Sequence, residues 1–302
     1  MGSVKSSCCE EKKPPEAEIL TKNEEKKVLF SIYETVNAQG STTTQSKISK
    51  IAAIESRMDP FIFDSNSSDE GIETFQSPEG WVYIGQVDDK GNKQGKGIFI
   101  WEDGSKYIGY WKNNMAHGRG RIIHIDGDVY EGDWICDKAE GQGKYLYSDG
   151  SAYEGEWKDD KQEGKGIQNW ADGSYYKGDF SKGLKHGNGE FYWADSSSYI
   201  GSFKENVISG FGVYVWPDKR RYEGEWGNNK MHGKGKYTWP DGKVYIGEYY
   251  EDKRQGYGEL TRSDGSKYKG NWKNGKKNGP GVKIDPSGNA VEGNWNEDVQ
   301  VN

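Results

Sequence analysis

The chain has 302 residues, and it combines 43 glycines and 14% aromatic residues with only 32% hydrophobic residues. A mean hydropathy of −1.02 excludes a large aliphatic core, although aromatic rings stacked in a line can still bury apolar surface. The formal net charge of −7 argues against nucleic acid as a partner, because proteins that bind it present a basic face.

The sequence has no apolar run of membrane-spanning length, and its first residues lack the apolar core of a secretory signal. It contains 3 cysteines, two of them adjacent, so a disulfide framework is not indicated. These features favour the reducing environment of the cytosol.

The first segment, residues 1–22, is expected to be disordered and acylated. It opens with MGSVKS, which fits the myristoylation pattern M-G-x-x-x-[ST] with Gly2 as acceptor. One myristoyl chain binds a membrane only marginally, so stable anchoring needs a second signal. Cys8 and Cys9 lie where palmitoylation commonly supplies this second signal. A polybasic patch does not supply it, because acidic residues offset the nearby lysines. The pattern therefore predicts dual acylation at Gly2, Cys8 and Cys9.

Residues 23–80 are predicted to be a mostly flexible, acidic linker with two short helices. One begins near Asn23, and the other runs from about Ser46 to Arg57, because the following Asp-Pro ends it. Their apolar residues, at three- and four-residue spacing, are Leu29, Ile32, Tyr33 and Val36 in the first helix and Ile48, Ile51, Ala52 and Ile54 in the second. Two interpretations stay open: the helices pack against the region that follows, or they recruit a partner or occlude its binding site.

Residues 81–302 contain internal repeats. From Tyr107 to Tyr268 a tyrosine recurs every 23 residues, with Tyr83 preceding and Val291 in the next position. A glycine follows each tyrosine by two residues, an aromatic residue usually follows by four, and a Gly-x-Gly comes later in each unit. Most units end with Asp-Gly, although Ser196 and Lys219 replace the glycine in two of them. This gives nine units and the first strand of a tenth.

Each unit is predicted to form a β-hairpin. In YEGDW, Tyr130, Gly132 and Trp134 share one face of a strand, and the two acids share the other, because side chains alternate. The polar segment between the two halves is the hairpin loop, and Asp-Gly turns the chain into the next unit. We expect the glycines to accept aromatic rings of the neighbouring unit and the acids to face water. The residues predicted to hold the repeats together include Tyr107, Gly109, Trp111, Tyr130, Gly132, Trp134, Tyr153, Gly155, Trp157, Tyr222, Gly224 and Trp226.

These residues closely resemble the MORN (membrane occupation and recognition nexus) repeat, whose consensus is near Y-E-G-E-W followed by G-x-G and D-G. The resemblance covers Trp81 to Trp295. It implies an all-β fold, an elongated single-layer antiparallel sheet of tandem hairpins. Such a sheet leaves its end strands open, and pairing of the edge at Val291–Trp295 with a second copy would give a homodimer.

No catalytic constellation or cofactor motif is present in the sequence, which predicts a protein that is not an enzyme and needs no cofactor. His117, His186 and His232 occupy the same position of different units, too far apart to share a metal ion. Carboxylate pairs such as Glu154 and Glu156 fall on the polar strand face, where solvation is the default. No metal site is expected.

The aromatic face is the candidate binding site, because MORN modules grip partner segments along such a face. Its candidate groove residues are Trp101, Tyr147, Trp170, Trp193, Trp216 and Trp239.

The first functional hypothesis is a membrane-anchored scaffold on the cytosolic face that binds a cytoskeletal protein partner. The second is a structural component of the ciliary axoneme, similar to radial-spoke proteins, or of the basal body or cortical cytoskeleton. A third is phosphoinositide recognition through Lys219, Arg220, Arg221, Lys276 and Lys277.

Overall fold

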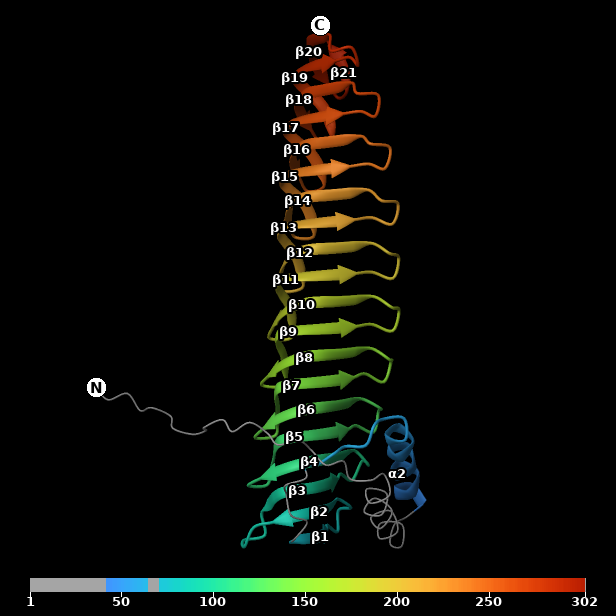
Figure 1. Ribbon diagram of the computed structural model, residues 1–302, viewed down its shortest axis with the longest axis vertical. Coiled ribbons are helices and arrows are strands. Elements are labelled where there is room, and N and C mark those ends of the chain that lie inside the picture. Colours follow the sequence, from blue (N-terminus) through green and yellow to red (C-terminus); the bar gives the residue numbers. More distant parts are fainter. Residues whose placement is uncertain (1–41, 65–70, 302) are drawn as a thin grey trace, which may run out of the picture. The chain divides into compact units, whose positions relative to one another are not determined.

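The computed structural model describes residues 42–64 and 71–301. All 21 strands of this part belong to one antiparallel sheet, and one helix, α2 (Thr42–Glu55), precedes them (Figure 1). The all-β fold expected from the sequence is thus confirmed. The strands are β1 (Ile72–Gln76), β2 (Val82–Val87), β3 (Lys93–Ile100), β4 (Lys106–Lys112), β5 (Met115–Ile123), β6 (Val129–Ile135), β7 (Lys138–Leu146), β8 (Ala152–Lys158), β9 (Lys161–Asn169), β10 (Tyr175–Ser181), β11 (Leu184–Tyr192), β12 (Ser198–Lys204), β13 (Val207–Val215), β14 (Arg221–Gly227), β15 (Lys230–Thr238), β16 (Val244–Tyr250), β17 (Lys253–Thr261), β18 (Lys267–Lys273), β19 (Lys276–Ile284), β20 (Ala290–Asn296) and β21 (Val299–Val301).

The described chain falls into two compact units. Unit 1 takes the described residues up to Met115 together with Ile123–Ile125, and unit 2 takes Ala116–Ile122 and the residues from Asp126 onward. In unit 1, strands β1 to β4 pair in chain order, and β1 lies in the segment expected to be a linker. In unit 2, every strand from β6 to β21 pairs with the next one in the chain, as Figure 1 shows.

The hairpins of unit 2 are closed by two-residue turns, whereas in unit 1 residues 88–92 join β2 to β3. Strand β8 has 7 residues and β9 has 9, and Asp159 and Asp160 join them with φ of 48° and 62°. Two successive left-handed residues are typical of a type I′ turn, and Asp, Asn and Gly tolerate that conformation best. Asp160 also ties its hairpin to the preceding one: its amide donates to the carbonyl of Ala139 at 3.2 Å, and its carboxylate accepts the amide of Ala139 at 2.7 Å.

The turns between repeats need a left-handed residue where most units have glycine. Ser196 and Lys219 stand in that position and adopt φ of 70° and 71°. The turn therefore forms in these two repeats as well, although a side chain in the left-handed conformation costs conformational energy that glycine does not.

A bulge interrupts the second strand at the first glycine of Gly-x-Gly. In β9, Gly164 has φ of 58°, and the register to β8 shifts between Gly155 and Glu156. The Glu156 carboxylate accepts the Lys165 amide at 2.8 Å, which satisfies a donor beside the bulge. The expectation that both acids of YEGEW merely face water is wrong for this one, and Asp133, Asp179, Glu225 and Glu248 make the same kind of bond.

The first tyrosine of each repeat lies on two paired glycines. Gly155 and Gly166 face each other across β8 and β9, and Tyr153 lies over both of them. Its side chain is fully buried, and its hydroxyl donates to the carbonyl of Glu156 at 2.9 Å. A Cβ on Gly166 would lie 2.5 Å from that hydroxyl oxygen. The glycines thus accept the tyrosine of their own repeat, and the prediction of a ring from the neighbouring unit is wrong.

The aromatic residue at the end of the first strand joins neighbouring repeats. Trp157 meets Tyr153 of its own strand edge to face at 5.2 Å and Tyr130 of the preceding repeat at 5.1 Å. Its indole N–H donates to the carbonyl of Gly143, also in the preceding repeat, at 3.1 Å. Edge-to-face pairs add about 0.5–1.5 kcal/mol beyond burial.

We call this continuous set of rings the buried ladder, and the sheet face that carries it the ladder face. The tyrosines and tryptophans predicted to hold the repeats together are all buried: Tyr107, Trp111, Tyr130, Trp134, Tyr153, Trp157, Tyr222 and Trp226. In unit 2 the contacts between repeats continue through Tyr153–Phe180, Tyr176–Phe203, Tyr199–Trp226, Tyr222–Tyr249, Tyr245–Trp272 and Tyr268–Trp295.

In unit 1, helix α2 and the residues after it cover the opposite face, which we call the charged face. Phe61 packs with Ile98 and Ile108, whose side chains alternate with the buried rings of Phe99 in β3 and Tyr107 in β4. Glu55 of the helix accepts a bond from Lys106 at 2.7 Å. The described helix therefore does not occlude the ladder face, and it begins earlier than the predicted Ser46. The helix expected from Asn23 lies outside the described residues. No described helix is long and apolar enough to cross a membrane.

At the C-terminal end, β21 pairs with part of β20. Asn294, Trp295 and Asn296 already have partners in β21. The homodimer suggested by the sequence would pair through Val291–Trp295. In this segment only the residues before Asn294 lack a partner in β21.

Replacing a glycine beneath a tyrosine should destabilise the sheet far more than replacing the acid beside it. In Gly155→Val, the new Cβ would lie 2.5 Å from the Gly166 Cα, a backbone atom that cannot move aside. We expect a loss of about 3 kcal/mol in the free energy of unfolding, the upper end for overpacking. Urea titration measures it.

Glu154→Val is the matched control, because its side chain is 69% exposed on the charged face and its change should stay within about 0.5 kcal/mol. Equal losses for the two variants would mean that the faces are assigned wrongly.

Candidate protein-binding surface

The six predicted groove residues occupy equivalent positions on the ladder face, each directly after the second strand of its repeat. Trp170, for example, opens the turn that follows β9: its amide donates to the carbonyl of Ser174 at 2.9 Å, and its carbonyl accepts the amide of Gly173 at 3.0 Å. Trp101, in unit 1, is 37% exposed, and the other five are half-buried. These rings are held by the turn but are not enclosed.

In unit 2, four of the predicted residues belong to one continuous row of rings, which we call the exposed row. Trp170, Trp193, Trp216 and Trp239 alternate in it with Phe191, Tyr214 and Tyr237. Successive ring centroids lie 4.3–5.3 Å apart. Trp101 contacts Phe99 at 4.9 Å in unit 1, and Tyr147 contacts Tyr145 at 4.5 Å. The row lies beside the buried ladder, since Tyr214 approaches Trp226 at 6.0 Å.

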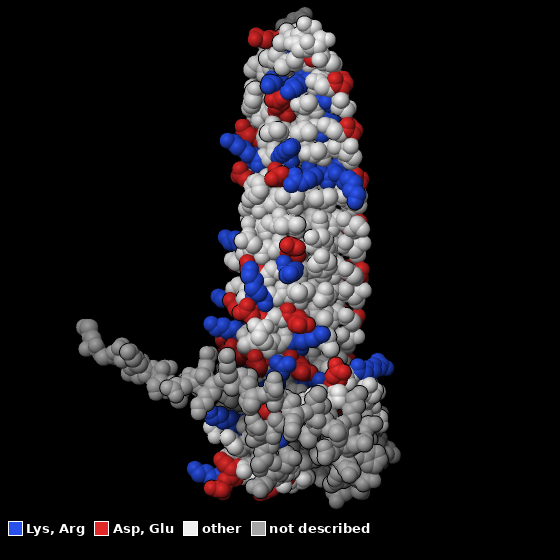
Figure 2. Space-filling model, viewed as in Figure 1, with Lys and Arg blue, Asp and Glu red and all other residues white. Residues whose placement is uncertain are grey.

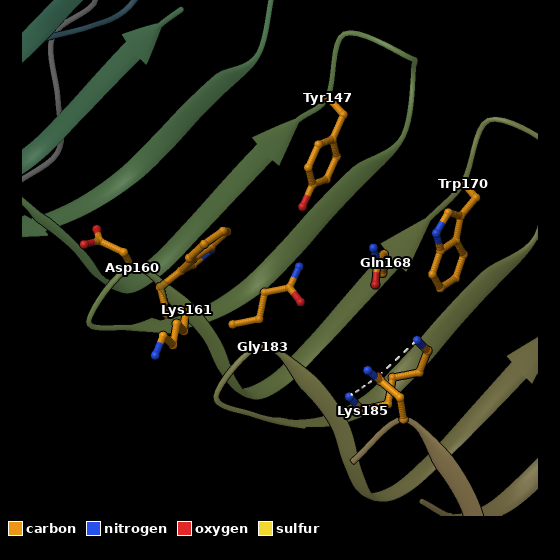
Figure 3. A pocket seen from close by; sticks show the side chains of 10 residues that line it. Tyr147, Asp160, Lys161, Gln168, Trp170, Gly183 and Lys185 are labelled. Carbon is orange, nitrogen blue, oxygen red and sulfur yellow. Dashed lines mark hydrogen bonds between the residues drawn. The ribbon is translucent and has the colours of Figure 1, made fainter. Parts of the chain in front are cut away.

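A polar residue interrupts the aromatic face between Tyr147 and Trp170. Gln168 stands where Tyr145, Phe191, Tyr214 and Tyr237 stand in other repeats. A cavity of about 470 Å³ opens here, and Figure 3 shows Gln168 between the rings of Tyr147 and Trp170 that line it. Its other lining residues include Trp157, Gln162 and Lys185. The gap is thus a polar, partly aromatic recess in the ladder face.

Lys185 brings a positive charge to this recess. Its ammonium lies over the rings of Trp170 at 5.2 Å and of Tyr176 and Phe191 at 5.7 Å, so it is held by cation–π attraction. Burial lowers the pKa of Lys185 from its usual value. Lys185 is not among the residues predicted from the sequence. Arg254 and Lys277 occupy the equivalent position in later repeats, so the recurrence of a cation in one register is the signal that could have identified it.

The C-terminal part of the ladder face is basic. Arg254 lies over Trp272 at 4.1 Å and Lys277 over Tyr268 at 4.9 Å. Burial lowers the pKa of Lys277, and the nearby charges of Arg262, Lys283 and Arg254 lower it further, whereas the charge of Asp298 opposes them. Four cations therefore act on one region of the face, and an anion bound there would relieve their mutual repulsion.

The charged face is electrostatically balanced by comparison. In the view of Figure 2, acidic and basic side chains occur together in several clusters, separated by uncharged surface. Among the residues proposed for phosphoinositide binding, Lys276 pairs with Glu297 at 3.1 Å and Arg221 with Glu223 at 2.6 Å on this face. Arg220 pairs with Asp218 at 2.6 Å but lies over the ring of Trp216 at 5.5 Å, and it therefore belongs to the ladder face. These ion pairs weaken the phosphoinositide hypothesis.

Two further sets of predicted residues bear on chemistry. Gly2, Cys8 and Cys9 lie outside the described residues, so their acylation stays a prediction. Within residues 42–64 and 71–301, no group of three or more His, Cys, Asp or Glu side chains is placed to hold a metal ion.

Comparison with known families identifies the repeats. A model described as MORN repeat matches residues 83–106, 107–129, 130–152, 153–175, 176–198, 199–219, 222–244, 245–267 and 268–290. This confirms the nine repeats expected from the sequence. No curated protein matches the chain.

Solved structures show weak similarity. The TCP10 domain of Danio rerio CPAP is 10% identical, with a TM-score of 0.36 over 74% of this chain and 100% of that one. The TCP domain of Drosophila melanogaster SAS-4, in complex with a proline-rich motif of Ana2, is 16% identical, with a TM-score of 0.30 over 63% and 98%. Virginiamycin B lyase from Staphylococcus aureus is 14% identical, with a TM-score of 0.15 over 75% and 70%. TM-scores this low carry no inference about function.

Filling the recess should stabilise the protein. In Gln168→Phe, the new ring would join Tyr147 and Trp170 and extend the exposed row, which should raise the free energy of unfolding by about 0.5–1.5 kcal/mol. Gln142→Phe, on the charged face, is the matched control for added apolar surface and should bring no gain. Thermal and urea unfolding measure both, and a Gln168→Phe protein no more stable than wild type would contradict the interpretation of the recess as a missing ring.

Proposed function

The chain belongs to the MORN repeat family, and from this premise we propose that it is a non-enzymatic scaffold. Its acylated N-terminus tethers it to the cytosolic face of a membrane, and its ladder face binds a cytoskeletal protein. The exposed row is the observation that carries the proposal. The buried ladder already joins each repeat to the next, whereas the exposed row leaves aromatic surface half open to solvent.

Aromatic residues are the side chains most often found at the centre of protein interfaces. A partner that covered the exposed row would bury rings that the turns already hold in place, so little side-chain entropy would be lost. The cations at the C-terminal part of the face add an electrostatic preference to this apolar contact. A partner on the charged face would gain less binding free energy, because many charges of that face are already paired with one another.

The membrane tether is tested by fractionation of cells that express the full chain. Gly2→Ala should move most of the protein to the soluble fraction, and Cys8→Ser with Cys9→Ser should weaken retention, because a single acyl chain binds only marginally. Ser3→Ala, at an unrestricted position of the pattern, is the control and should behave as wild type.

A Gly2→Ala protein that stays with membranes as fully as wild type would overturn the tether. Retention of wild type with microtubules after detergent extraction would favour an axonemal or basal-body component instead.

The binding face is tested by proximity labelling in the native cell. Trp193→Arg with Trp216→Arg should lose the principal labelled proteins, and the fold should tolerate the change because Arg262 occupies the equivalent position in another repeat. Phe211→Arg is the matched control, since Phe211 is 58% exposed on the charged face of β13. Identical labelling by the tryptophan variant and wild type would refute the assignment of the face.

A further inference from the structure

We propose that the partner segment on the ladder face of unit 2 is a proline-rich polyproline II helix. It carries proline at every third residue, and its acidic end lies over β17 to β19. This inference rests on the proposed function, because it names the class of partner that the same face receives.

The spacing of the rings is the first argument. The four tryptophans of the exposed row belong to four successive repeats, and one repeat is two strands wide. They are Trp170, Trp193, Trp216 and Trp239. Strands lie about 4.7–4.9 Å apart, so equivalent rings recur every 9.4–9.8 Å or so across the sheet. A polyproline II helix rises about 3.1 Å per residue with three residues per turn, which is about 9.3 Å per turn. One turn of such a helix therefore matches one repeat.

Other backbone conformations fit this spacing less well. A β-strand presents one face every two residues, about 6.6 Å, and an α-helix presents one every 5.4 Å or so per turn. A β-strand does not return the same face at the spacing of one repeat. Two turns of an α-helix span about 10.8 Å, which exceeds one repeat by about 1 Å, and this excess accumulates to about 3 Å over three repeats. A polyproline II segment of about nine residues would return the same face to each ring from Trp170 to Trp239, with its proline rings in contact with the aromatic side chains.

The chemistry of the exposed row suits such a segment. Polyproline II has no internal hydrogen bonds and is largely formed before binding, so docking it orders little additional backbone. The row offers ring surface at a regular interval. Lys185, Arg220 and Lys243 lie over Trp170, Trp216 and Trp239, so a docked segment would share these rings with the cations or displace the cations. The sheet beneath the row is already paired on both sides of every strand from β7 to β20, except where β21 is shorter than β20. A partner would thus bind through side chains and not as an added strand.

Charge complementarity indicates that one end of the partner segment is acidic. The exposed row stops at Trp239, and the equivalent position in the next repeat is Arg262. Arg254, Lys277 and Lys283 lie on the same part of the face, and their charges act on one another. Two acids lie near these cations. Asp285 follows Arg262 in the register, and its carboxylate already accepts bonds from Asn289 at 2.7 and 2.9 Å. Asp298 acts on Lys277 and Arg254, and its carboxylate accepts the amide of Lys277 at 2.9 Å, so one acid faces four cations. Acidic residues one or two turns beyond the last proline would neutralise these cations.

The direct test uses synthetic peptides and the full-length protein, with binding followed by tryptophan fluorescence and calorimetry. The first peptide has proline at every third residue over five turns and ends in four glutamates. The second has the same residues in an order that removes the three-residue spacing of proline. The third replaces the glutamates of the first by lysines.

We expect the first peptide to bind at least tenfold more tightly than either of the others. Trp193→Arg with Trp216→Arg should abolish its binding, and Phe211→Arg should not. Arg262→Glu with Lys283→Glu should weaken the first peptide and strengthen the third, a reversal that loss of folding cannot produce.

Equal affinities for the first two peptides, or no binding of any of them, would overturn the inference. If the tryptophan variant still loses its labelled proteins in cells while no proline-rich peptide binds, the proposed function stands and only the class of partner is wrong.

Discussion

The structure depends on one close contact, a tyrosine ring lying on two glycines that face each other across a hairpin. Tyr153 can lie over Gly155 and Gly166 only because neither glycine has a Cβ. This arrangement lets a sheet one layer thick bury a large side chain, which otherwise requires a second layer of structure. The glycine that weakens a strand by its flexibility is therefore what gives this strand a core.

The same contact explains how the repeats assemble and what they leave free. Trp157 completes the enclosure of Tyr130 in the preceding repeat, so each hairpin is stable only beside a neighbour, as in other linear repeat proteins. Because the buried ladder makes these contacts, the aromatic residues after the second strand are not needed to join the repeats. Trp193 and Trp216 are consequently available for binding, and positions such as Arg262 can vary without loss of the turn.

The sequence predicts the strands, their faces and the period well, because alternation and 23-residue spacing are local properties that Tyr130, Gly132 and Trp134 already display. Contacts between strands are less accessible to it. Spacing alone does not show whether a ring covers the glycines of its own repeat or those of the neighbouring repeat. The sequence therefore predicts the wrong partner for Tyr153. Glu156 looks like a solvated acid until the bulge at Gly164 turns an amide toward it. The recess at Gln168 and the cations around Arg254 become visible only when equivalent positions are compared across repeats.

The most direct test of this account is a spectroscopic titration of the tyrosines at alkaline pH. Burial raises the pKa of the ladder tyrosines, to about 12 for Tyr199, because a phenolate cannot be solvated over the glycines. Their contribution to stability is therefore complete below the ordinary pKa near 10 and is lost as pH rises through the folded value. We expect exposed tyrosines to ionise near pH 10 and the ladder tyrosines to ionise only at higher pH, together with loss of the β-sheet circular dichroism signal. Ionisation of all 20 tyrosines near pH 10 with the sheet intact would contradict the account.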